Sequence, residues 1–145
     1  MTGALALALL LSLFPHVLFR ACIEARAAQI ARTADASTVP APVLLTVALM
    51  ESHFGCHPAS GGCWGAPADP QHRHDAGTPS QAAHALATGF RVCGTWEGAV
   101  GRFRSGLCRP TTVQHRRYVR TVLGLVEAVY TRGGVAVPTT LRGAP

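Results

Sequence analysis

The sequence contains no lysine, so all 13 of its basic side chains are arginines, and only seven residues are acidic. The formal net charge is therefore +6. A positive balance favours an acidic partner, such as nucleic acid, anionic lipid or an anionic cell-wall polymer. Solubility explains the same charge without any partner, and a lack of lysine is also typical of a GC-rich genome. The charge alone therefore selects no function.

Charged residues of both signs are scarce, at 14% of the chain, whereas 48% of the residues are hydrophobic. This composition excludes an intrinsically disordered protein. A length of 145 residues supplies one core with short extensions, and not two cores. No stretch has a strong strand pattern and no segment repeats, so the sequence predicts a single, mainly α domain.

An uninterrupted apolar run, Ala4–Leu13, stands near the start of the chain. Its length suits the core of a signal peptide or a marginal membrane anchor. Ala25-Arg26-Ala27 offers a small-x-small cleavage site, although Met1-Thr2-Gly3 carries no basic residue. We expect residues 1–27 to be a signal peptide or membrane anchor outside the fold. The protein is then exported to the periplasm or the cell envelope.

The cysteines agree with export. Cleavage after Ala27 removes Cys22 and leaves four, the even number that a disulfide framework requires. Of the three pairings that four cysteines allow, we favour the local one, Cys56–Cys63 with Cys93–Cys108. The alternative is a metal site within a crowded group of six residues: His53, Cys56, His57, Cys63, His72 and His74. This group lacks the Cys-x-x-Cys spacing of common structural zinc sites, so we predict no metal.

The stretch from Val43 to Phe54 predicts a helix that is apolar on nearly every side, with Gly55 as its stop. Such a helix belongs in the middle of a core. Glu51 shares a face with Leu44, Val47 and Ala48, whereas the polar Thr46 and His53 lie on another face. Burial disfavours the charged form of a carboxyl group, which suits a general acid. The pattern equally allows a glutamate that reaches water or pairs with an arginine.

Capping signals predict three more helices in the second half of the chain. Thr78-Pro79-Ser80-Gln81 is a capping box with proline at the first helical position. Thr95 can cap a helix that stops at Gly106, and Thr111-x-x-Gln114 repeats the capping box. The remaining segments are an Ala-rich helix over 23–34, a long loop over 55–77 and a flexible tail over 133–145.

Four segments, taken in order, carry a family resemblance. Val39–Phe54 is an apolar helix that ends in a Glu-Ser pair and an aromatic residue, and Ser60-Gly-Gly-Cys-Trp-Gly65 follows it. Ala99-Val-Gly-Arg-Phe-Arg-Ser-Gly106 comes next, and Tyr118-Val119 with Val122-Leu123 begins the last long helix. Together they resemble the catalytic domain of the soluble lytic transglycosylases, which are lysozyme-like enzymes. The resemblance covers roughly residues 23–130.

The resemblance implies a lysozyme-like domain over residues 28–132 with a long, disulfide-pinned active-site loop. Glu51 is then the single acid/base that cleaves the MurNAc–GlcNAc bond of peptidoglycan glycan strands. The product carries a 1,6-anhydro ring, and the reaction needs no metal or cofactor. Trp64 either stacks on a sugar or fills the core beside the loop. The substrate contacts implied are Ser52, Ser60, Trp64, Gly65, Phe103 and Tyr118.

Two departures from the family pattern bear on these contacts. The family's Gly-Leu-Met-Gln is replaced by Gly65-Ala66-Pro67-Ala68, and its Tyr-Asn pair by Phe103-Arg104. The first removes a polar group, and the second removes a hydroxyl and adds a positive charge. Neither change affects Glu51.

Three other functions are compatible with the sequence. The first is a lysozyme-type muramidase that uses a second carboxylate. The second is an inactive wall-binding or assembly module of a secretion, conjugation or phage system, in which case the protein is associated with the virion or the transfer apparatus. The third is a nucleic-acid binder, which the export signal and the cysteines disfavour, so we predict no nucleic-acid partner.

Overall fold

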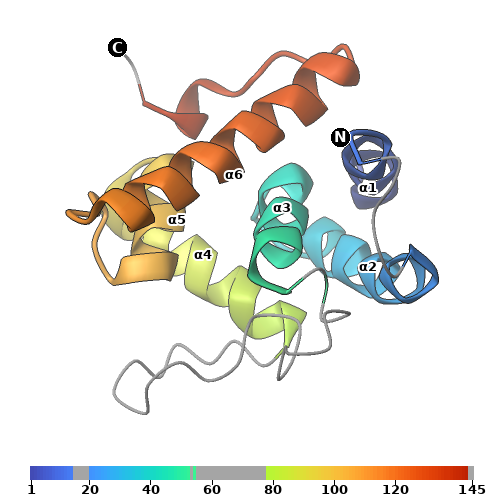
Figure 1. Cartoon of the computed structure of the whole chain (residues 1–145), viewed down its shortest axis with the longest axis horizontal. Helices are drawn as coiled ribbons and strands as arrows, with labels where there is room; N and C mark the ends of the chain where they lie inside the picture. The colour runs from blue at the N-terminus through green and yellow to red at the C-terminus, as the bar shows by residue number, and fades with distance from the viewer. Residues whose placement is uncertain (15–19, 53, 55–77, 144–145) are drawn as a thin grey trace.

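A computed structural model describes residues 1–14, 20–52, 54 and 78–143 of the chain. These residues form six α-helices and a short 3-10 helix, and none of them lies in a β-strand. The prediction of a mainly α protein is therefore confirmed (Figure 1). The elements are α1 (Gly3–Ser12), α2 (Arg20–Asp35), α3 (Ala41–Ser52), α4 (Pro79–Cys93), α5 (Trp96–Ser105), α6 (Val113–Arg132) and η1 (Thr139–Leu141).

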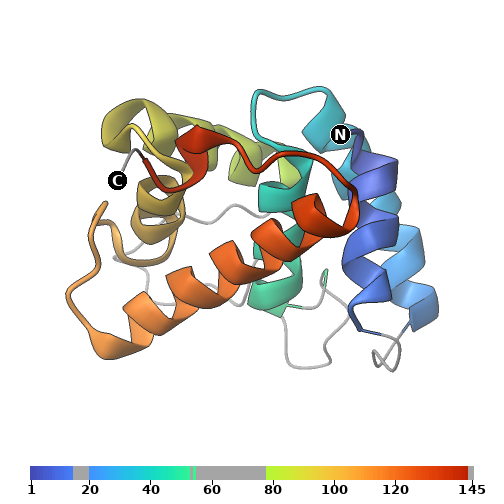
Figure 2. The same ribbon diagram turned by 90° about the horizontal axis from the view of Figure 1, so that it is seen from above.

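Helix α3 lies at the centre of the molecule, as its sequence predicted. It contacts α1, α2, α4 and α6, and every residue from 41 to 49 is buried. Figures 1 and 2 show α3 between the α1–α2 pair on one side and α6 on the other. The prediction of a polar face was wrong at Thr46, which is completely buried. Helix α3 is therefore enclosed around its whole circumference over most of its length.

The ends of the later helices follow their capping residues. Thr78 and Gln81 form the predicted capping box of α4, and Thr95 caps α5 through the Gly98 N–H. Gly106 ends α5 with a φ of 78°, a conformation that costs glycine little. The predicted cap of α6 was wrong by one residue, because Thr112 and not Thr111 accepts a hydrogen bond from the His115 N–H.

Helix α1 differs from the prediction that residues 1–27 lie outside the fold. Ala6 and Leu10 are fully buried, and α1 packs against α2, α3 and α6. A Cβ atom at Gly3 would collide with the backbone of Ala31, so the two helices touch closely. Asp35 accepts a hydrogen bond of 2.7 Å from the Gly3 N–H. The apolar run thus has a packed place in this structure, whereas cleavage or anchoring of the segment stays a prediction.

No helix in the described part of the chain is both long enough and apolar enough to cross a membrane. Helix α1 has ten residues, against the roughly 20 that a membrane-spanning helix needs.

The C-terminal segment also differs from the prediction of a flexible tail over 133–145. It returns along α6 and forms η1, where the Leu141 side chain is only 1% exposed (Figure 2). The Arg142 guanidinium pairs with the Glu127 carboxylate on α6, with Nε 2.5 Å from Oε1. One buried leucine and one ion pair therefore hold this segment against the helices.

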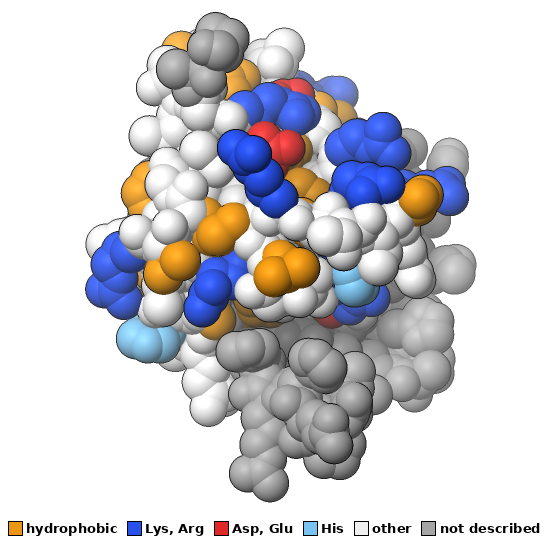
Figure 3. Space-filling model, turned by 90° about the vertical axis from the view of Figure 1, so that its left-hand side faces the viewer, with side chains coloured by type: hydrophobic (Ala, Val, Ile, Leu, Met, Phe, Trp, Pro, Cys, Tyr) orange, Lys and Arg blue, Asp and Glu red, His pale blue; other side chains and the backbone are white. Residues whose placement is uncertain are grey.

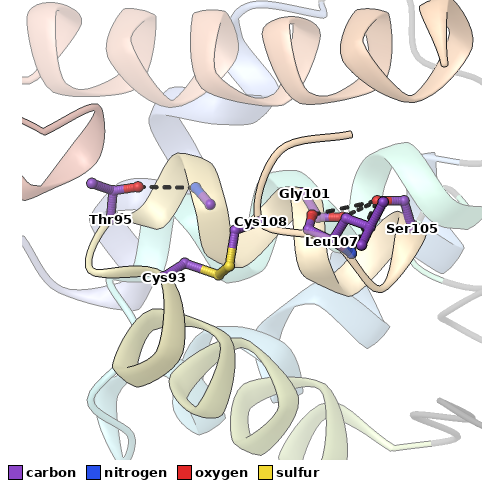
Figure 4. The surroundings of a disulfide bond; sticks show 7 residues. Cys93, Thr95, Gly101, Ser105, Leu107 and Cys108 are labelled. Carbon is purple, nitrogen blue, oxygen red and sulfur yellow. Dashed lines mark hydrogen bonds between the residues drawn. A yellow bond between two sulfur atoms is a disulfide. The ribbon is translucent and has the colours of Figure 1, made fainter. Parts of the chain in front are cut away.

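A disulfide bond joins the end of α4 to the segment that follows α5. Figure 4 shows Cys93 and Cys108, whose Cα atoms lie 5.6 Å apart, so this half of the predicted pairing is confirmed. Cys56 and Cys63, the other predicted pair, lie outside the described residues. Cys22 on α2 also takes part in a disulfide bond. The prediction had omitted Cys22 because it removed this residue with the leader.

Removal of the Cys93–Cys108 bridge should lower the free energy of unfolding by about 3 kcal/mol, since the bridge closes a loop with a sequence separation of 15. We expect this loss in the double variant Cys93→Ser with Cys108→Ser, measured by urea unfolding. The single variant Cys93→Ser should lose the same free energy of unfolding, because either substitution breaks the bridge. A double variant that unfolds at the wild-type urea concentration would contradict the assignment.

Candidate active site around Glu51

Glu51 lies in the last turn of α3, where the buried part of the helix ends. Its side chain is only 7% exposed. Two side chains from other helices face it: Arg104 near the end of α5 and Tyr118 on α6. Three helices that are distant in sequence therefore bring a carboxylate, a guanidinium and a phenol together.

Arg104 is the ion-pair partner of Glu51. Its Nη1 atom donates a hydrogen bond of 3.2 Å to Oε2 of the carboxylate. The Arg104 side chain is 40% exposed, so solvent reaches the guanidinium while the carboxylate stays nearly buried. The ion pair thus lies where the interior of the protein meets solvent. An ion pair that solvent reaches contributes little to stability, so the free-energy cost of replacing the anionic partner of the guanidinium is small.

Tyr118 lies against both members of the pair. The Arg104 guanidinium carbon is 5.2 Å from the centre of the Tyr118 ring, within the range of a cation–π contact. Burial is the largest cause that raises the pKa of Tyr118 well above its usual value, and the negative charge of Glu51 and a hydrogen bond to it raise the pKa further. The charge of Arg104 acts in the opposite direction. The phenol is therefore held in its neutral form.

Two buried oxygen atoms of the site have no hydrogen-bond partner of standard geometry among the described residues. They are Glu51 Oε1 and Tyr118 Oη; Thr46 Oγ1, also on α3, is the third such atom. Tyr118 Oη lies near enough to the Glu51 carboxylate to raise the pKa of the phenol, but the two groups do not form a hydrogen bond of standard geometry. Buried polar atoms without partners are rare in proteins and often mark functional sites. The hydrogen-bonding capacity of one carboxylate oxygen and one hydroxyl is thus not met by regular hydrogen bonds to the described residues.

Backbone strain follows directly after the helix that carries Glu51. Phe54 has a φ of 60°, the only positive φ of a non-glycine residue among the described residues. Its side chain is fully buried, and its N–H donates to the Ala48 carbonyl over 3.1 Å. A bulky residue in this region costs on the order of 1–3 kcal/mol and is found most often near functional sites. The predicted stop at Gly55 lies outside the described residues.

The structure brings together two of the residues that the family resemblance placed in the site, Glu51 and Tyr118. Phe103 on α5 is half-buried and packs against the core, and Ser52 lies in the last turn of α3. Ser60, Trp64 and Gly65 lie outside the described residues.

Arg104 is the site residue that the sequence did not place. In the sequence it stands only as a departure from the family pattern, and the expectation that this departure does not affect Glu51 was wrong, because Arg104 pairs with the Glu51 carboxylate. The alternative that an arginine pairs with Glu51 matches this geometry. The rule that buried charges are paired required a cation near Glu51, but it could not select one of 13 arginines.

The other described carboxylates lie elsewhere. Glu24 and Asp35 line a groove between α1 and α2, Glu97 lines a groove between α5 and α6, and Glu127 pairs with Arg142. None of the four is a partner of Glu51. No group of three or more His, Cys, Asp or Glu side chains within the described ranges is placed to hold a metal ion. The six residues of the alternative metal site lie outside those ranges.

No protein-family model, no curated protein and no solved structure matches this chain. Its function therefore has to be inferred from its own residues.

The raised pKa of Tyr118 predicts a loss of stability in alkali. Because folding raises the pKa, this contribution is complete below the ordinary tyrosine pKa of about 10 and is lost as the pH rises through the higher folded value. We expect the free energy of unfolding to fall above about pH 10. The fall should be shallower in Tyr118→Phe, as measured by urea unfolding across this pH range.

Tyr130→Phe is the matched control. Burial also raises the pKa of Tyr130, but less than that of Tyr118, and no neighbouring carboxylate adds to the shift. This variant should therefore flatten the alkaline fall less than Tyr118→Phe does. Equal slopes for Tyr118→Phe and the wild type would show that the Tyr118 phenol is not perturbed by its surroundings.

Proposed function

We propose that this protein is a lysozyme-like peptidoglycan lytic transglycosylase in which Glu51 is the single acid/base. The observation that carries the proposal is the state of the Glu51 carboxyl group. It is 7% exposed, it is held from one side by Arg104, and its Oε1 atom has no partner among the described residues. Proton transfer to a substrate requires a carboxyl oxygen that is fixed in place and is not engaged by another group of the protein.

The reaction is a proton transfer in two steps. Protonated Glu51 donates its proton to the glycosidic oxygen between N-acetylmuramic acid and N-acetylglucosamine, and the bond from that oxygen to the muramoyl C1 breaks. An oxocarbenium-like charge develops on the sugar, as in other glycoside cleavages. The Glu51 carboxylate then removes the proton from the muramoyl C6 hydroxyl, whose oxygen bonds to C1. The 1,6-anhydro ring closes without water, and Glu51 is again protonated.

The positions of the other described carboxylates are compatible with a single acid/base, whereas Asp69 and Asp75 lie outside the described residues. Hydrolysis with retention needs a second carboxylate about 5 Å from the acid, and inversion needs one about 6.5–9.5 Å away. Each described carboxylate other than Glu51 contacts a different part of the molecule. In the proposed reaction the substrate's own N-acetyl group and C6 hydroxyl replace the second carboxylate.

Arg104 and Tyr118 have positioning roles in this proposal. Arg104 binds Oε2 and so leaves Oε1 for the substrate. Tyr118 keeps its proton because its pKa is raised, so its hydroxyl remains a donor beside the carboxylate across the pH range in which the enzyme works.

A second candidate is a wall-binding or assembly module that does not cleave. The ion pair favours it, because a carboxylate paired with an arginine can serve structure alone. The two functions differ in an observable way. Only the enzyme dissolves peptidoglycan, whereas the binding module would sediment with intact wall material and leave it uncut.

Glu51→Gln should abolish lysis of purified peptidoglycan in a zymogram while the far-ultraviolet circular dichroism stays at the wild-type level. The amide keeps the shape of the side chain but removes the titrating proton. Asp35→Asn is the matched control, since Asp35 lies on α2 and the amide oxygen can still accept from Gly3. Wild-type lysis by Glu51→Gln would disprove the acid/base role. Wild-type protein that binds but never lyses would favour the binding module.

Digestion of peptidoglycan should release 1,6-anhydromuropeptides and create no new reducing ends, as measured by mass spectrometry. The reason is that the C6 hydroxyl, and not water, attacks C1. Asp69 and Asp75 are the two aspartates of the predicted loop over residues 55–77, which follows Glu51. Asp69→Asn and Asp75→Asn should leave the 1,6-anhydro product unchanged. If each cut adds one water and either variant stops the reaction, the protein is a lysozyme-type muramidase with a second carboxylate.

A further inference from the structure

A concave site lies on the opposite side of α6 from Glu51. It is a groove of about 640 Å³ between the start of α5, the first turns of α6 and the segment after η1. Arg116 and Arg120 line the groove, and each is two residues from Tyr118 along α6. Two residues correspond to about 200° of rotation around a helix, so these arginines project away from the face that carries Tyr118. Helix α6 therefore separates the groove from the Glu51 site.

The groove is strongly positive. Four arginines line it, namely Arg109, Arg116, Arg120 and Arg142, against one carboxylate, Glu97. Arg142 already pairs with Glu127, and Arg116 donates to the Thr111 carbonyl oxygen. Arg109, Arg116 and Arg120 have no ion pair with any described residue. Figure 3 shows this face of the molecule, where arginine side chains gather around a small acidic area.

The floor and rim of the groove are apolar and rigid. The Cys93–Cys108 disulfide lines it, together with Pro110 and the buried Val119 (Figure 4 shows the disulfide). Val113 stands at the rim with 70% of its surface exposed. Grooves of this volume are large enough for a small organic molecule. Apolar lining residues beside several guanidinium groups that form no ion pair within the described part of the chain suit a ligand that has an organic body and several negative charges.

We propose that this groove binds a small organic anion that carries two or more phosphate or carboxylate groups. A guanidinium matches both groups with paired N–H donors, so three arginines that have no ion pair with a described residue can hold at least two such groups at once. The proposal does not depend on the reaction at Glu51. It assigns a separate role to the arginines on this side of α6, whereas Arg104 belongs to the Glu51 site.

The test is isothermal titration calorimetry of the full chain with two probes, inorganic pyrophosphate and citrate, at low and at moderate salt. Tighter binding of pyrophosphate identifies a phosphate ligand, and tighter binding of citrate identifies a polycarboxylate. The double variant Arg116→Gln with Arg120→Gln should weaken the better probe by about tenfold or more, because each change removes charge-assisted hydrogen bonds. Arg109→Gln, in the segment before α6, should weaken it by a smaller factor.

Arg117→Gln with Arg132→Gln is the matched control. This double variant removes the same charge from exposed positions of α6 that do not line the groove. Its affinity for the better probe should stay within about twofold of the wild-type affinity. Glu51→Gln should also bind as the wild type does, so failure of the catalytic proposal leaves this one standing. No binding of either probe, or equal loss in both double variants, would overturn the proposal.

Discussion

The complete burial of α3 is the constraint on which the rest of the structure depends. Each large aliphatic side chain that leaves water contributes about 1.5–3 kcal/mol, and residues 41–49 are all buried. A helix that is apolar around its whole circumference can be stable only when other helices cover every side. The α1–α2 pair, α4 and α6 supply that cover. The arrangement of the fold is therefore largely the arrangement of partners around one helix.

This constraint also creates the candidate site. The enclosure of α3 ends at its last turn, and Glu51 is placed where the interior meets the surface. Its carboxyl group is desolvated enough to need a partner and open enough for Arg104 to reach it from α5. The same crowding holds the Tyr118 phenol neutral and leaves one oxygen of each residue without a regular partner. Buried polar groups of this kind cost stability, which is expected where function requires them.

Helix α6 separates the arginine of the Glu51 site from the arginines that line the groove. Tyr118 faces α3 and meets Arg104, while Arg116 and Arg120 project into the groove beside the Cys93–Cys108 disulfide. Arginines that lie close together in the sequence therefore belong to two surfaces with different neighbours. In one of them a guanidinium neutralises a carboxylate, and in the other three guanidinium groups have no ion pair with a described residue.

The sequence by itself determined the helices, because local signals decide them: the apolar run of α3, the Thr78–Gln81 capping box, and Thr95 with Gly106 around α5. It also marked Glu51 as unusual, since periodicity shows which face a residue shares. Only the tertiary structure decided which of 13 arginines pairs with Glu51, because that contact joins residues 53 positions apart. The tertiary structure likewise gave α1 and Leu141 their buried places. Burial of an end segment depends on distant partners that no local pattern contains.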